Sequence, residues 1–205
     1  VETLQDMNGE GDAPIRHRFL SIIEREARRM QQLVIDLLSI SRVEADRFRR
    51  PTRPVNLAAI VKTTIAQLQD SEAARPKDII ARLGRGAQPV LGDEAQLGQL
   101  AHNIISNAMK YGRPGTPVTV ELAREGQRVR FSVSDEGEGI APDHLPRLTE
   151  RFYRVDEARS RSVGGTGLGL AIVKHISERH QGQLDIESEL GKGTKVSVTF
   201  PLAST

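Results

Sequence analysis

Three polar side chains on one predicted helix are the first candidates for chemistry. Asn103, Asn107 and Lys110 are four and three residues apart, so in a helix they project from one shared face. Asparagine is a poor residue for a helix interior, so two on one stripe indicate a specific use. Solvent exposure or a capping contact would explain them equally well. The spacing therefore predicts a wall of two amides and one amine.

A second candidate is the carboxylate of Asp135, which follows directly on a predicted strand. Gly137 and Gly139 come next and indicate a sharp turn in which a flat ligand could approach the backbone closely. An aspartate can accept a hydrogen bond from an exocyclic amine such as that of adenine, which is a specificity contact and not a catalytic one. Turns of this composition also occur without a function, so both interpretations stay open.

A cluster of glycines precedes an apolar helical run. The cluster reads Gly164-Gly165-Thr166-Gly167-Leu168-Gly169. Open amides at a helix start, joined to a glycine loop, can cradle phosphate. It is not a Walker motif, because no Gly-Lys-Ser/Thr follows, and it lacks the preceding strand of a dinucleotide fingerprint. The pattern favours phosphate binding over the alternative of a hinge.

The segment between the two glycine sites, residues 141–163, is rich in Arg, Asp and Glu. Phe152-Tyr153-Arg154 lies near its middle. Its length, its polarity and the glycines at both ends suit a lid that closes over a ligand. A solvated charged face is the alternative.

One long helix is predicted ahead of these segments. Apolar residues recur at three- and four-residue steps from Ile15 to Val43, between faces rich in Arg and Glu. A surface helix packed on a core is one interpretation. The stripe is longer than most globular helices require, which favours one half of a helical hairpin that dimerises.

A linker is predicted at residues 49–54, because Pro51 and Pro54 disfavour a helix. It divides the chain into a helical unit, residues 1–50, and a second unit, residues 54–205. The second unit is expected to hold helices at 55–72, 93–111 and 166–182, strands at 78–83 and 89–91, and hairpins at 118–122/129–133 and 183–188/195–200. Paired strands with helices between them predict an α+β sandwich, with helices on one face of a mixed sheet.

The composition excludes several classes of protein. The chain has 205 residues, 38% hydrophobic and 27% charged, with a net charge of +2, so no basic face for nucleic acid is expected. The absence of cysteine excludes disulfides, thiolate zinc sites and cysteine nucleophiles. No apolar run of about 18 residues and no signal peptide is present, so no membrane segment is expected in this chain.

The order of these motifs resembles the N, first-glycine, F and second-glycine boxes of the sensor histidine kinases of two-component systems. The resemblance extends to Asp36–Glu44 in the long helix and to Gly191–Thr194 near the end, so it covers nearly the whole chain. Residues 148–156 look most like the phosphate-regulon sensor branch. The resemblance implies the histidine kinase/Hsp90-like ATPase fold for the second unit, preceded by a partial dimerisation and histidine-phosphotransfer hairpin, with ATP and Mg²⁺ as cofactors.

The resemblance also implies roles for individual residues. Asn107, and with it Asn103, would ligate Mg²⁺ beside the triphosphate, and Lys110 would contact phosphate oxygens. Tyr111 would lie against the adenine, and Asp135 would accept its amino hydrogens. Related ATPases of this fold carry a glutamate where Asn103 stands. Because an amide cannot act as a base at neutral pH, Asn103 argues for phosphoryl transfer over fast hydrolysis.

The remaining implied residues are glycines and the lid arginine. Arg154 could reach the γ-phosphate and stabilise charge in transfer, and it completes a catalytic set with Asn103 and Lys110. The residues expected to admit the base or surround the phosphates are Gly137, Gly139, Gly165, Thr166, Gly167, Leu168 and Gly169.

One family motif is missing. An H-box has a histidine, an acidic residue and then Asn or Thr before Pro, and none of the five histidines has these neighbours. Val1–Met7 resembles the end of the first hairpin helix, so a chain boundary just downstream of the H-box is expected.

The chain is therefore expected to bind Mg-ATP without phosphorylating itself. The parent protein would be a homodimer anchored in the bacterial inner membrane, with this part in the cytoplasm and a response-regulator receiver domain as partner. The alternatives are an ATPase of the same fold and a degenerate scaffold that no longer binds nucleotide.

Overall fold

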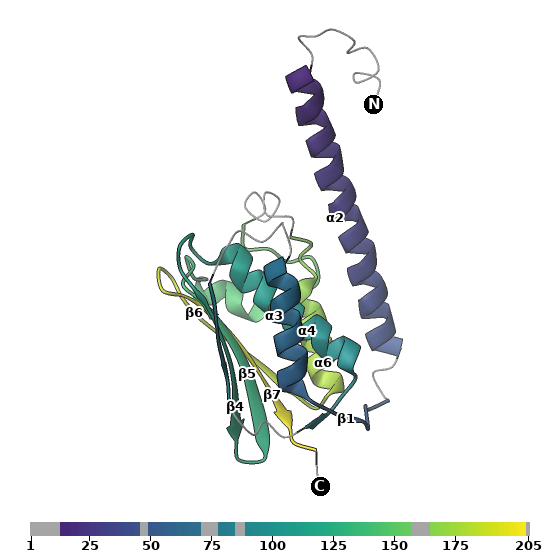
Figure 1. Cartoon of the computed structure of the whole chain (residues 1–205), viewed down its shortest axis with the longest axis vertical. Helices are drawn as coiled ribbons and strands as arrows, with labels where there is room; N and C mark the ends of the chain where they lie inside the picture. The colour runs from purple at the N-terminus through teal and green to yellow at the C-terminus, as the bar shows by residue number, and fades with distance from the viewer. Residues whose placement is uncertain (1–12, 46–48, 71–77, 85–88, 157–164, 204–205) are drawn as a thin grey trace.

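The computed structural model describes residues 13–45, 49–70, 78–84, 89–156 and 165–203. Its longest element is helix α2 (Ala13–Ala45), which confirms the predicted long helix. The apolar stripe divides along this helix. Ile40 and Val43 are buried, whereas residues such as Phe19 and Ile23 are exposed. Figure 1 shows the N-terminal part of α2 projecting beyond the rest of the molecule, while its C-terminal part lies beside α6.

A short two-stranded sheet and a helix follow the predicted linker. Strand β1 (Pro54–Val55) pairs antiparallel with β3 (Val90–Leu91). Helix α3 (Leu57–Asp70) begins two residues later than expected. The side-chain oxygen of Asn56 accepts a hydrogen bond from the Ala59 amide at 3.1 Å and so caps the helix start. Residues 71 and 72 of the expected helix lie outside the described residues.

The main sheet has five strands in the order β2-β4-β5-β7-β6. They are β2 (Ile79–Leu83), β4 (Val118–Glu125), β5 (Arg128–Asp135), β6 (Gln183–Glu189) and β7 (Gly193–Pro201). The pairing of β2 with β4 is parallel and the other pairings are antiparallel. The sheet is therefore mixed, and both predicted hairpins are present with longer strands than expected.

Helices α3, α4 (Glu94–Tyr111) and α6 (Gly169–Arg179) cover one face of this sheet, as Figure 1 shows. The core lies between the two layers. The largest side chains that are completely buried there include Phe131, Phe200, Ile104, Ile105 and Ile176. The arrangement confirms the predicted α+β sandwich.

Helix α6 begins at Gly169 and not near Thr166, so the predicted helix start is wrong by three residues. Gly167 has a φ of +75°, which no α-helix accommodates, and residues 165–168 form a loop instead.

The described part of the predicted lid holds a short 3₁₀ helix, η2 (Pro142–Arg147). Residues 157–163 of the predicted lid lie outside the described residues. In the part of the chain that the structure describes, no helix is both long and apolar enough to cross a membrane.

Candidate functional site

A cavity of about 320 Å³ lies between α4, the end of β5, the lid and the glycine loop. Its size fits the range of small-molecule sites. Every predicted site residue except Gly137 and Leu168 lines it. These residues are Asn103, Asn107, Lys110, Tyr111, Asp135, Gly139, Arg154, Gly165, Thr166, Gly167 and Gly169. The predicted site residues, which lie up to 66 residues apart in the chain, therefore meet at one pocket.

Helix α4 supplies one wall. Its start is capped by Asp93, whose side chain accepts a hydrogen bond from the Gln96 amide at 3.1 Å. Its apolar face is buried in the core, so the polar stripe faces the cavity. The Asn103 side-chain nitrogen donates to the Gly169 carbonyl at 3.3 Å. Because a carbonyl can only accept, this bond fixes the amide orientation and leaves the Asn103 Oδ1 as the acceptor.

The basic groups of this wall are electrostatically coupled. Partial burial lowers the pKa of Lys110, and the nearby carboxylate of Asp36 raises it in part. Partial burial also lowers the pKa of His102, and the positive charge of Lys110 lowers it further. Both side chains keep a solvent-exposed surface because the pocket is open. Sequence reasoning missed His102 as a pocket residue, since only its position next to Asn103 points to it.

The first glycine segment is built on the end of the sheet. Asp135 Oδ1 accepts a hydrogen bond from the Gly137 amide at 2.8 Å. A Cβ at Gly137 would lie 2.6 Å from the Tyr111 carbonyl oxygen, and one at Gly139 would lie 2.0 Å from that of Glu189. The protein's own backbone thus occupies the space that these glycines leave. Gly137 is buried and does not line the cavity, so packing of the chain accounts for this glycine, and its role in admitting a base stays a prediction.

The second glycine segment contacts the lid. A Cβ at Gly167 would lie 2.9 Å from backbone atoms of Phe152, and the Phe152 amide donates to the Gly167 carbonyl at 2.9 Å. The Arg154 guanidinium donates to the Gly165 carbonyl. The Leu168 side chain is buried in the core, so only its backbone could contact a phosphate. The predicted lid and the predicted phosphate loop therefore hold each other.

Tyr153 completes the lid side of the cavity. Its hydroxyl forms a hydrogen bond with His144 Nδ1 at 2.6 Å. The guanidinium of Arg147 lies 4.2 Å from the centre of its ring, a cation–π geometry. These contacts hold the aromatic ring against the pocket.

Helix α2 contributes an unexpected pair of pocket residues, Gln32 and Asp36. Asp36 is only 4% exposed. Its Oδ2 accepts a hydrogen bond from the Thr166 hydroxyl at 2.7 Å, and its Oδ1 accepts one from the Gln32 side chain at 2.8 Å. The sequence did contain a signal for Asp36 as a pocket residue. It is a carboxylate on the buried side of the helix, in line with Ile40 and Val43.

The donor set fits a magnesium ion that arrives with phosphates. Among the described residues, no group of three His, Asp or Glu side chains could hold a metal ion. Asn103 and Asn107 offer amide oxygens in the cavity, and Mg²⁺ is often held by few protein oxygens together with substrate phosphates and water. The chemistry of these residues therefore fits a nucleotide-bound Mg²⁺.

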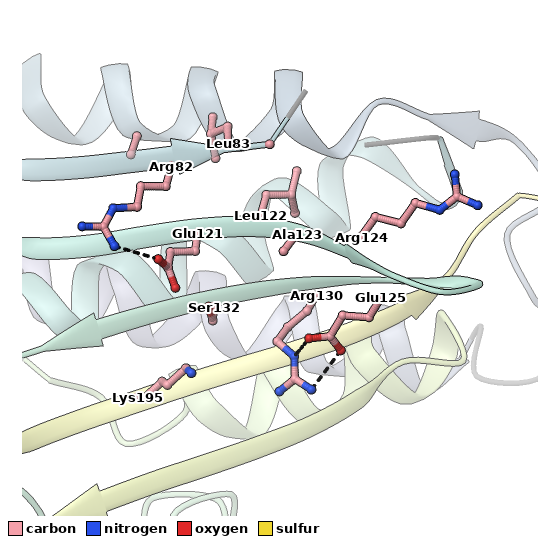
Figure 2. Close-up of a pocket in the computed structure, with 12 residues that line it drawn as sticks. Arg82, Leu83, Glu121, Leu122, Ala123, Arg124, Glu125, Arg130, Ser132 and Lys195 are labelled. Carbon is pink, nitrogen blue, oxygen red and sulfur yellow. Dashed lines mark hydrogen bonds and ion pairs between the residues drawn. The ribbon is translucent and has the colours of Figure 1, made fainter. Parts of the chain in front are cut away.

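A larger hollow of about 830 Å³ lies on the open face of the sheet (Figure 2). Four of its charged side chains form two ion pairs. Arg82 lies 3.2 Å from Glu121, and Arg130 lies 2.7 Å from Glu125. It holds none of the predicted site residues and is open to solvent, so the smaller cavity is the candidate site.

Comparisons with known proteins agree with this site. Residues 92–204 match the family described as histidine kinase-, DNA gyrase B- and HSP90-like ATPases. The chain is 39% identical over 203 residues to the phosphate regulon sensor protein PhoR of Pseudomonas aeruginosa, covering 98% of this chain and 45% of PhoR. It is 38% identical over 192 residues to the sensor histidine kinase RppB of Synechocystis sp., covering 94% and 42%. The chain thus spans less than half the length of these relatives.

Solved structures give the same result. Full-length ShkA in complex with AMPPNP superposes with a TM-score of 0.74 at 30% identity, covering 93% of this chain and 39% of ShkA. The mycobacterial sensor histidine kinase MprB superposes with a TM-score of 0.62 at 26% identity, covering 73% of this chain and 97% of that one. The chain therefore belongs to the family of histidine kinase-, DNA gyrase B- and HSP90-like ATPases, in its sensor histidine kinase branch.

Proposed function

We propose that this chain binds Mg-ATP in the α4 pocket and catalyses transfer of the γ-phosphoryl group to a histidine nitrogen. The parent protein then passes that group to an aspartate of a response-regulator receiver domain. The observation that carries the proposal is the convergence of four separate motifs, 103–110, 135–139, 152–154 and 165–169, on one cavity. An AMPPNP-bound relative of the same fold supports a nucleotide as the ligand.

The phosphate end of the pocket holds the groups that transfer requires. Asn107 and Asn103 ligate Mg²⁺ through their amide oxygens, and Mg²⁺ when bound neutralises charge on the phosphates. Lys110 and Arg154 add positive charge near the transferred group. Asn103 cannot remove a proton from water, which favours transfer to a histidine over hydrolysis.

The other end of the pocket suits an adenine. Asp135 lies at the end of β5 and accepts the amino hydrogens of the base. Tyr111 stacks on it, and the apolar side chains of Ile140, Ile186 and Val196 line the same cavity. A largely apolar lining with a few polar groups that fix the orientation of the ligand is the usual form of a small-molecule site.

Two units divide these tasks in the proposal. Residues 54–205 form the ATP-binding domain, and residues 1–50 belong to a dimerisation hairpin. Exposed apolar residues on α2, among them Phe19, Ile22 and Ile23, support dimerisation, because a helix that lies in solvent seldom carries such a stripe. An inner-membrane anchor in the parent protein, with this part in the cytoplasm, belongs to the same proposal.

A reconstituted phosphotransfer assay tests this function. The chain would be mixed with γ-labelled ATP and a separate helical hairpin that carries an H-box. Acid-labile, base-stable label is expected on the hairpin and not on the chain, since none of its histidines lies in an H-box. An Asn107→Ala variant is the inactive control.

Other outcomes would contradict the proposal. Acid-labile, base-stable label on the chain itself would show that it needs no external histidine. Rapid release of free phosphate without labelled hairpin would identify an ATPase, and failure of a fluorescent ATP analogue to bind would identify a scaffold.

A further inference from the structure

The candidate nucleotide pocket is not confined to the ATPase domain. The family match begins at residue 92, yet Asp36 from helix α2 lines the cavity. The C-terminal half of α2 is packed on the domain around this point. Ile40 and Val43 are buried, and the Ser39 hydroxyl donates to the Gln99 side-chain oxygen at 2.6 Å. Glu44 pairs with Arg151 at the far end of the contact.

Asp36 acts directly on the glycine loop. Its carboxylate accepts a hydrogen bond from the Thr166 hydroxyl at 2.7 Å. That hydroxyl in turn accepts a bond from the Leu168 amide at 3.3 Å. Thr166 is therefore the link between α2 and the turn that precedes helix α6, and its only hydroxyl proton is used by Asp36.

Asp36 also acts on the positive charge of the pocket. Its carboxylate raises the pKa of Lys110, against the lowering caused by burial, so its field reaches the ammonium group. Among the described residues, the hydrogen-bond donors to Asp36 are Thr166 and Gln32, and both are neutral. A carboxylate that is 4% exposed with neutral partners is a costly group to bury. It is also costly to place beside an incoming triphosphate.

One of the donors that Asp36 engages, the Thr166 hydroxyl, lies in the loop that is predicted to surround the phosphates. A phosphate oxygen at the loop competes with the carboxylate for the Thr166 hydroxyl, and it is repelled by the Asp36 charge in a partly desolvated site. We propose that Asp36 is an affinity-determining residue of the nucleotide pocket, which holds the phosphate loop in place of phosphate, so that α2 docking and nucleotide binding oppose each other. This inference rests on the proposed ATP binding.

Thermodynamic reciprocity makes the coupling measurable from either side. If docked α2 weakens ATP binding, bound ATP weakens α2 docking by the same factor. The nucleotide state of the pocket then changes how tightly α2 docks on the domain. The exposed half of this helix carries the apolar stripe.

The first test measures nucleotide affinity in the full chain by competition with a fluorescent ATP analogue. Asp36→Asn keeps the size of the side chain and removes its charge. We expect ATP to bind about fivefold more tightly to this variant, ADP less so, and adenosine within about twofold of the unmodified chain, because the repulsion scales with phosphate charge.

Glu24→Gln is the matched control. Glu24 is also a carboxylate on α2, but it pairs with Arg28 on the exposed part of the helix and does not line the pocket. The same change in net charge should leave ATP affinity within about twofold, because an exposed distant charge is screened.

The second test measures docking directly. The chain has no cysteine, so Met30→Cys and Gln67→Cys introduce two unique spin-label sites, one on α2 and one on α3. We expect ATP to lengthen or broaden the distance distribution between them. In the Asp36→Asn background the broader distribution should already be present without ATP.

The outcomes separate this inference from the proposed function. Weaker ATP binding by Asp36→Asn would show that the carboxylate supports the phosphates or their metal ion, and an equal gain for ATP and adenosine would show a general loosening of the pocket. Either result, or a distance distribution that ATP leaves unchanged, overturns the inference while ATP binding stands. Absence of ATP binding to the unmodified chain overturns both.

Discussion

The two glycine segments of the pocket have similar compositions but are held in different ways. Residues 135–139 are fixed by backbone contacts with the β6–β7 hairpin. A Cβ at Gly139 would meet the Glu189 carbonyl, and one at Gly193 would meet that of Asp135. Residues 165–169 are held by the lid and by α2, through Phe152, Arg154 and Asp36. The base end is therefore part of the sheet, whereas the phosphate end is held by segments that lie outside the sheet.

Gly139→Ala should have the largest effect on stability, because Gly139 lies in the segment that packs against the backbone of the β6–β7 hairpin. Gly139 has a φ of +70°, and its Cβ would lie 2.0 Å from a backbone oxygen. We expect a loss of about 3 kcal/mol in the free energy of unfolding, measured by urea denaturation. Gly126→Ala is the control, since Gly126 has a φ of +60° with no atom of the described residues within 4 Å of the Cβ, and about 1 kcal/mol is expected there. Equal losses would show that backbone strain alone explains the glycine.

Asn107→Ala should weaken Mg-ATP binding strongly and leave adenosine binding nearly unchanged. The variant removes an amide oxygen from the phosphate end of the cavity. A lost contact to a charged ligand costs about 2 kcal/mol, or roughly 30-fold in Kd. Titration calorimetry with and without Mg²⁺ measures it. An equal loss for adenosine would place Asn107 at the base end instead.

Acidification should destabilise the junction of α4 with α6. His180 Nε2 accepts a hydrogen bond from the Asp93 amide at 3.0 Å, and its Nδ1 donates to the Ile176 carbonyl at 2.8 Å. The first bond requires a neutral ring, because a protonated Nε2 can only donate, and burial lowers the pKa of His180. The unfolded chain therefore binds the proton more readily, so the stabilisation is complete above about pH 6.5 and is lost as the pH falls below it.

The expected loss between pH 7 and pH 5 is on the order of 1 kcal/mol, measured from urea midpoints. Burial also lowers the pKa of His102, which increases the loss of stability at low pH. A His180→Asn variant should remove most of this pH dependence, and His102→Asn should remove a smaller part. If His180→Asn keeps the full pH dependence, His180 is not its source.

Tyr153→Phe should have the smallest effect. It removes the hydrogen bond to His144 but keeps the ring beneath Arg147. We expect ATP affinity to fall by about threefold or less, because the lid keeps its backbone contact with Gly167. A larger loss would show that the Tyr153 hydroxyl, and not the backbone contact with Gly167, holds the lid.

Sequence patterns were sufficient for most of the elements. Period-two alternation located both hairpins, and Asp93 marked the start of α4, because these signals act within a few neighbouring residues. The start of α6 was misplaced, because Gly167 has a φ of +75° and Thr166 is hydrogen-bonded to Asp36, 130 residues away. The packing of Gly137 against the Tyr111 carbonyl was not predicted, because a pattern cannot show which backbone segment packs against a glycine.

The sequence by itself determined the residue types of the nucleotide site, their order along the chain and the family to which they belong. Those properties are carried by local motifs and can be read from the sequence alone. Only the tertiary structure decided that helix α2 completes the pocket and that Asp36 meets Thr166. A contact between distant segments depends on how two elements pack, and no local pattern in either one encodes its partner.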